Sequence, residues 1–188
     1  FYRSVDVTIP KQIDDFIDAV KAEFKGIDIL ISNAGMNVFK GAEKATNEDW
    51  EFNSDLNFKS HWLISRKAKS LLEEGSGGTI IIITSNLAFQ TLKGCFPYNA
   101  SKAGLVGLVK SLGIEWGPEI RTVGIAPGFI LTEASDSWFN SFENPEEEFK
   151  RTIGLHPVGK LGTVEEIGAL CAFLSSEFAD FITGTTYL

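Results

Sequence analysis

An uninterrupted apolar run at residues 79–84, Thr-Ile-Ile-Ile-Ile-Thr, constrains the fold of this chain more than any other feature. A run of this length predicts a β-strand buried on both faces, which is the usual environment of strands in a parallel sheet. The segments 27–31 and 121–126 predict further strands, and helical patterns at 47–72 and 98–116 lie between or beside them. This alternation predicts an α/β protein.

The two ends of the chain continue the alternation. Thr8 and Pro10 predict the start of a helix, as its cap and a first-turn residue, and Gly26 predicts its end. Thr163 predicts the cap of a further helix. Two more strand segments are expected, the tail of one at 1–6 and the last one at 182–188.

Polar side chains stand where the isoleucine strand ends and the next helix begins. Ser85 follows the strand, and Tyr98 falls in the first turn of the helix at 98–116. In open α/β sheets, ligands bind at this carboxyl-terminal rim. We therefore expect Ser85 and Tyr98 to face a bound ligand.

Tyr98 and Lys102 are four residues apart, so on a helix they share one face. A free tyrosine has a pKa of about 10 and is a poor base at neutral pH. The lysine ammonium and the positive end of the helix both favour the phenolate. The spacing therefore predicts a lowered pKa for Tyr98 and a site for proton transfer to or from an alcohol or carbonyl.

These motifs resemble the classical branch of the short-chain dehydrogenase/reductase family. Residues 98–102 match the family's Tyr-x-x-x-Lys, and Ser85 precedes Tyr98 by the family's usual distance. Residues 32–35, Ser-Asn-Ala-Gly, resemble its Asn-Asn-Ala-Gly, and 127–132 resemble its Pro-Gly-x-x-x-Thr. The resemblance implies a Rossmann-like, doubly wound parallel sheet flanked by helices, as a single domain over 1–188.

The resemblance also implies an NAD(P)-dependent oxidoreductase that moves a hydride between the nicotinamide and a carbonyl or secondary alcohol. It implies four catalytic residues, which are Asn57, Ser85, Tyr98 and Lys102. It implies that the NAD or NADP cofactor contacts Asp6, Asn33, Ala34, Gly35, Tyr98, Lys102, Pro127, Gly128, Ile130 and Thr132. For Asp6, a plain helix-start or turn residue is the alternative interpretation, and no metal is expected.

Other expectations follow from the same resemblance. Residues 133–162 correspond to the family's substrate lid, and the helices at 47–72 and 98–116 to a homo-oligomer interface, as a dimer or tetramer. The family's first strand and its Gly-rich, pyrophosphate-binding turn do not occur in these residues. We therefore expect a split sheet, and a chain that either is part of a longer molecule or does not bind dinucleotide by itself.

Composition restricts the possible partners. The net charge of −8 argues against nucleic acid or an anionic membrane surface, and no apolar run approaches the roughly 20 residues of a membrane span. Two cysteines, Cys95 and Cys171, without a secretory signal fit a cytoplasmic protein that needs no disulfide. His61 and His156 are isolated, and we expect them at the surface or in packing rather than at a metal.

Two alternatives to the oxidoreductase remain open. One is a catalytically idle nucleotide-sensing or assembly module on the same fold, since a fold does not secure a function. The other is an epimerase or dehydratase that uses the same tyrosine and lysine. The substrate is a small carbonyl or alcohol whose class the sequence does not specify. The residues expected to border its pocket are Lys93, Phe96, Phe129, Trp138 and Phe139.

Overall fold

The computed structural model describes residues 1–75 and 77–188, and its strands form one parallel sheet in the order β1-β2-β3-β4. The strands are β1 (Ile29–Ser32), β2 (Gly78–Ile83), β3 (Ile120–Ile125) and β4 (Thr186–Tyr187). Ile80 and Ile82 belong to one core cluster and Ile81 to another, and all three are fully buried. The isoleucine run is therefore confirmed as a strand buried on both faces.

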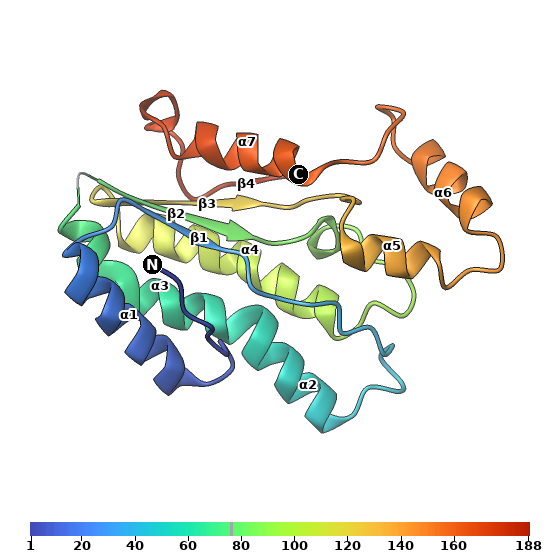
Figure 1. The fold of residues 1–188 in the computed structure, drawn as a ribbon, viewed down its shortest axis with the longest axis horizontal. Helices are drawn as coiled ribbons and strands as arrows, with labels where there is room; N and C mark the ends of the chain where they lie inside the picture. Colours follow the sequence, from blue (N-terminus) through green and yellow to red (C-terminus); the bar gives the residue numbers. More distant parts are fainter. Residues whose placement is uncertain (76) are drawn as a thin grey trace.

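Helices cover both faces of the sheet (Figure 1). On one side lie α1 (Pro10–Phe24), α3 (Ser60–Glu73) and α4 (Tyr98–Glu115), whose apolar residues form the larger core cluster. On the other side lies α7 (Val164–Leu174), which is followed by the short 3₁₀ segment Glu177–Ala179. Thr163 caps α7 as predicted, because its hydroxyl accepts a hydrogen bond from the Glu166 N–H. The predicted Rossmann-like layering is confirmed.

The long helix predicted at 47–72 forms with a change of pitch near its middle. It consists of α2 (Asn47–Ser54), a π-helical segment (Asp55–Lys59) and α3. Asn57, one of the four residues expected to be catalytic, lies in the π-helical segment. π-helical turns inside α-helices occur frequently at functional sites. The pitch change thus marks the part of this helix that faces the predicted site.

The small residues of α4 allow one close contact within the chain. An added Cβ at Gly104 would lie 3.0 Å from the ring of Phe58 in the π-helical segment. At Gly107 the same addition would meet nothing within 4 Å. The close approach is therefore made at Gly104 by Phe58, and Gly107 leaves an open surface.

The amino-terminal part corrects three expectations. Residues 1–6 form no strand, because a strand segment needs a paired neighbour and none of the described strands lies beside them. Ile9, rather than Thr8, is the N-cap of α1, and the Thr8 hydroxyl donates to the Asp6 carboxylate at 2.7 Å. The helix ends at Phe24 with Lys25 at φ 64°, one residue before Gly26.

The predicted splitting of the sheet does not occur, since the described strands pair without a gap. Instead, β1 forms one edge of the sheet, and Ile29 and Ile31 are 44% and 48% exposed. In the described part of the chain, this edge and its apolar side chains therefore remain uncovered.

The predicted lid region contains two short helices, α5 (Glu133–Phe139) and α6 (Pro145–Gly154), which extend beyond the carboxyl ends of the strands (Figure 1). Thr132 and Asn144 cap them. Among their aromatic residues, Phe139 contacts both Phe129 and Phe149, at centroid distances of 5.2 Å. None of the described helices is long and apolar enough to cross a membrane.

Candidate active site

Three loops meet at the carboxyl edge of the sheet because the strands they follow are parallel. Asn33 follows β1, Ser85 follows β2, and Pro127 follows β3 closely. The loop after β2 continues into a 3₁₀ turn (Asn86–Ala88), whose Asn86 N–H donates to the Pro127 carbonyl at 3.0 Å. Backbone hydrogen bonds therefore hold two of the three loops together.

Tyr98 is the first residue of α4 and is only 9% exposed. The Ser85 hydroxyl lies near its phenol, and its ring meets the Phe39 ring edge-on at 5.4 Å between centroids. Burial raises the pKa of Tyr98, the nearby Ser85 hydroxyl opposes this, and Cys95 adds a smaller increase. The predicted lowering of this pKa is therefore wrong for the described chain, because burial outweighs the lowering by Ser85.

Lys102 lies one turn later on α4 and is 3% exposed. Its Nζ donates to the Ile83 carbonyl at 2.9 Å and lies 5.6 Å from the centroid of the Tyr98 ring. Burial lowers the pKa of Lys102 to about 8. The predicted shared face is confirmed, and it holds a buried amine between a strand end and an aromatic ring.

Asn57 is fully buried and holds the loop that follows β1. Its Oδ1 accepts from the Met36 N–H at 3.1 Å, and its Nδ2 donates to the Met36 carbonyl at 2.9 Å. A Cβ added at Gly35 would lie 2.7 Å from Asn57 Oδ1 and 3.6 Å from Lys102 Nζ. Glycine at position 35 therefore allows the Asn57 amide and the Lys102 amine to approach the same stretch of backbone.

His61 lies beneath this loop and is fully buried. Its Nδ1 lies 2.7 Å from the Ser32 hydroxyl, and within the described residues its Nε2 has no hydrogen-bond partner. Burial, and next the charge of Lys102, lower the pKa of His61 to about 3. The ring is thus neutral near neutral pH, in keeping with the packing role that was one of the two expectations.

Four of the residues predicted to bind the cofactor line one groove, and these are Asn33, Pro127, Ile130 and Thr132. The groove has a volume of about 910 Å³ and continues along Ile29, Ile31 and the α7 residues Ile167 and Gly168. Asn33 and Thr132 supply polar groups near the strand ends, Ser175 and Ser176 supply others after α7, and most of the remaining lining is apolar. A flat ring with an amide, such as a nicotinamide, fits the chemistry near the strand ends.

The other residues predicted to bind the cofactor lie in different settings. Ala34 and Gly128 are exposed in the loops after β1 and β3. The Thr132 hydroxyl already accepts from the Ser135 N–H at 3.2 Å, as the cap of α5. Asp6 accepts two hydrogen bonds from Thr8, which lower the pKa of its carboxyl, and does not line the groove. For Asp6, the structure matches the turn interpretation.

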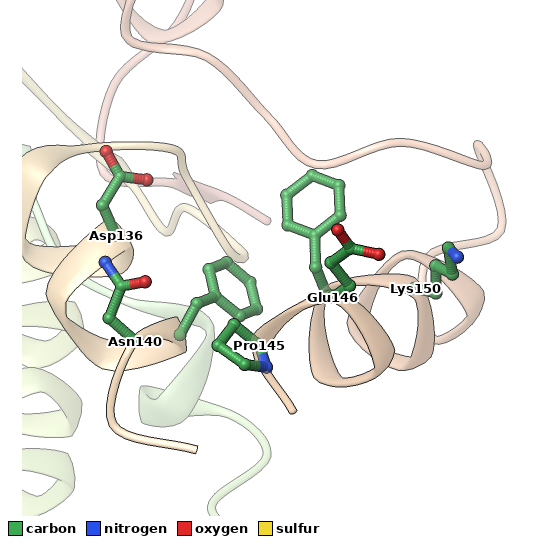
Figure 2. A pocket seen from close by; sticks show the side chains of 7 residues that line it. Asp136, Asn140, Pro145, Glu146 and Lys150 are labelled. Atoms are coloured by element: carbon green, nitrogen blue, oxygen red, sulfur yellow. The ribbon is translucent and has the colours of Figure 1, made fainter. Parts of the chain in front are cut away.

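A second cavity of about 460 Å³ lies between α5 and α6 (Figure 2). Asp136 and Asn140 border it from α5, and Glu146 and Lys150 border it from α6. None of the four residues predicted to be catalytic lines it. All of the residues that border it belong to 133–162, so it lies within the predicted lid region.

Sequence reasoning missed three residues that contact the site. Asn53 donates to the Pro97 carbonyl directly before Tyr98, Phe39 packs on the Tyr98 ring, and Ser32 pairs with His61. One signal was present: Asn53, Asn57 and His61 recur at four-residue spacing. Such a polar line inside an apolar helix indicates a buried polar face.

Comparisons with known proteins agree with this arrangement. A family model described as Enoyl-(Acyl carrier protein) reductase matches residues 2–188. The Homo sapiens protein named Dehydrogenase/reductase SDR family member 4 is 39% identical over 163 residues, which are 86% of this chain and 57% of that protein. The probable 2,4-dienoyl-CoA reductase of Bacillus subtilis is 36% identical over 185 residues, 96% of this chain and 71% of that protein.

A solved structure gives the same result. L-sorbose reductase from Gluconobacter frateurii, complexed with NADPH and L-sorbose, superposes with a TM-score of 0.91 at 29% identity. The match covers 98% of this chain and 73% of that one. The chain thus spans 57% of the human relative and about three quarters of this structure. From the family match over nearly its whole length, this chain belongs to the short-chain dehydrogenase/reductase family.

Proposed function

We propose that this protein is an NAD(P)-dependent oxidoreductase that interconverts a carbonyl and a secondary alcohol, with Tyr98 as general acid and base. One observation carries the proposal. At the carboxyl edge of the sheet, the Ser85 hydroxyl is near enough to Tyr98 to lower the pKa of its phenol, and the Lys102 Nζ lies 5.6 Å from the centroid of the same ring. A hydroxyl, a phenol and an amine in this order suit proton exchange with a substrate oxygen.

The protonation states support reduction of a carbonyl near neutral pH. Because burial raises the pKa of Tyr98, its phenol carries the proton that a reduced carbonyl oxygen needs. Lys102, with a pKa of about 8, is mostly charged near pH 7 and would stabilise the phenolate left behind. Ser85 would orient the substrate oxygen, and Asn57 would keep the proton path to Lys102 in place.

The groove residues support a nicotinamide cofactor, either NAD or NADP. Asn33, Pro127, Ile130 and Thr132 would hold the nicotinamide end, with Lys102 near its ribose. When bound, the cofactor supplies the hydride chemistry, and the protein supplies position and the proton. The Bacillus subtilis relative is named for a dienoyl-CoA and the Gluconobacter frateurii enzyme for L-sorbose, so the substrate class is proposed only as a small carbonyl or alcohol. Residues 133–162 would form the lid over it.

Two further proposals concern the assembly and its environment. The open surface at Gly107 and the exposed Trp62 and Ile114 support a homo-oligomer interface, which a light-scattering mass would test. Cys95 and Cys171 are free, which supports a cytoplasmic protein. Fractionation of the cells that produce it would test this.

The substitution Tyr98→Phe tests the catalytic proposal. It removes one hydroxyl, so turnover should fall roughly 10²- to 10⁴-fold, the usual contribution of a general acid or base. The absorbance of the reduced nicotinamide, followed over a panel of carbonyls, measures it. Tyr2→Phe is the matched control, because Tyr2 is 89% exposed and away from the site. Undiminished turnover in Tyr98→Phe would remove the assignment, and cofactor binding without turnover in the unaltered protein would favour the idle sensing module.

A further inference from the structure

A line of buried polar side chains runs along the helix that carries Asn57. Asn53, Asn57, His61 and Ser65 recur every four residues, and each is fully buried. In a regular α-helix, four residues advance about 40° beyond a full turn, so such a line drifts around the helix. The wider π-helical turn at Asp55–Lys59 opposes this drift. The pitch change therefore reduces the drift along this line where it passes Asn57.

Asn53 is fully buried, and both its side-chain nitrogen and its side-chain oxygen form hydrogen bonds. Its Nδ2 donates to the Pro97 carbonyl at 3.1 Å and to the Ser101 hydroxyl at 2.8 Å. Its Oδ1 accepts from Asn57 Nδ2 at 2.9 Å. One amide thus joins the end of α2, the start of α4 and the π-helical segment.

The partners of Asn53 are the immediate neighbours of the proposed proton-transfer residues. Pro97 directly precedes Tyr98, and Ser101 directly precedes Lys102. Asn57 is bonded to Asn53 itself. Asn53 is therefore bonded to Asn57 and to the residues directly before Tyr98 and Lys102, and none of the hydrogen bonds described above joins it to the Tyr98 hydroxyl or the Lys102 amine.

We propose that Asn53 is a positioning residue, which fixes the Asn57 amide and the first turn of α4 relative to each other. The expected effect of Asn53 on turnover rests on the proposed function, whereas its effect on the position of Asn57 does not. Without the Asn53 amide, Asn57 keeps its bonds to Met36 but loses the partner that fixes its side chain on the other side. The loop after β1 would then loosen along with Asn57.

The chain offers a direct measure of that loosening. Met36 is its only methionine, and the Met36 N–H donates to Asn57 Oδ1. Labelling with ¹⁵N-methionine therefore gives one backbone amide signal, whose hydrogen exchange reports on the Asn57 contact. In Asn53→Leu, this exchange should accelerate about tenfold or more, as expected for the loss of a buried hydrogen-bond partner.

Ser65→Ala is the matched control. Ser65 is fully buried on the same helix and donates to the His61 carbonyl, so its loss removes a buried hydrogen bond away from Asn53. The Met36 exchange rate should stay within about twofold in this variant.

Should Asn53→Leu fail to fold, Ser101→Ala removes a single partner of Asn53, and exchange should rise by about threefold. Equal Met36 exchange in the control and in the foldable Asn53 or Ser101 variant would overturn the proposal.

Turnover gives the second readout. Asn53→Leu should lower kcat by roughly ten- to hundredfold with KM within about twofold, because misplaced catalytic groups affect reaction more than binding. Intact turnover in Tyr98→Phe would refute the proposed function, while Met36 exchange would still decide whether Asn53 positions Asn57. If Tyr98→Phe is inactive and Asn53→Leu exchanges and turns over as the control does, only the role of Asn53 is refuted.

Discussion

Replacing Lys102 by methionine should make the protein more stable while removing its proposed activity. Lys102 is 3% exposed, and methionine would replace it with an apolar side chain of similar length. Because burial lowers its pKa to about 8, charging this amine is harder in the folded protein than in the unfolded chain. Methionine would abolish that penalty.

The magnitude follows from the difference between about 8 and the ordinary value of 10.5. With about 1.4 kcal/mol per pKa unit, the buried charge costs about 3 kcal/mol near pH 7. Loss of the bond to the Ile83 carbonyl offsets about 1 kcal/mol of the gain, so Lys102→Met should be about 2 kcal/mol more stable. Below about pH 8 the amine is charged in both the folded protein and the unfolded chain, so the full penalty applies. The penalty therefore fades as the pH rises from about 8 to 10.5.

Urea unfolding near neutral pH and near pH 10, followed by tryptophan fluorescence, measures this difference. Lys110→Met on the same helix is the control, because Lys110 is exposed. Wild type and Lys102→Met should differ near pH 7 and become nearly equal near pH 10, whereas the control should show no such pH dependence. An equal gain at both pH values, or no gain at either, would refute the reasoning from a buried charge.

Two other changes test the same region. In Gly35→Ala, the new methyl would lie 2.7 Å from Asn57 Oδ1, so kcat should fall by roughly ten- to hundredfold with the fold retained, and steady-state kinetics would detect it. His61 has its folded pKa lowered to about 3, so its contribution to stability is present above about pH 6.5 and is lost as the pH falls. His61→Gln should therefore gain about 2 kcal/mol relative to wild type between about pH 7 and pH 5 in urea unfolding, and parallel curves would contradict this.

The sequence predicted the sheet well because its central strands carry their own signal. An isoleucine run needs burial on both faces, and Ile80 and Ile81 find it in two different core clusters. Residues 1–6 have a strand-like composition but form no strand, because pairing depends on a neighbour that local residues do not reveal. Boundaries elsewhere moved by a few residues at most.

For the candidate site, spacing predicted which side chains come together but not their electrostatics. Strand order and helix periodicity suffice to bring Ser85, Tyr98 and Lys102 to one edge. The direction of the Tyr98 pKa shift depends on burial by surrounding residues such as Phe39, which a four-residue spacing does not contain. The part played by Asn53 was hidden because its partners are far away in sequence.

The π-helical segment Asp55–Lys59 has a consequence for how this protein tolerates change in length. Such a segment holds one residue more than the regular helix would need over the same rise. A chain shortened by one residue there could restore an ordinary α-helix and keep the packing of α2 and α3, yet turn the Asn57 amide away from Met36. A deletion at this point would thus affect folding and activity differently, and the shortened protein would fold without being active.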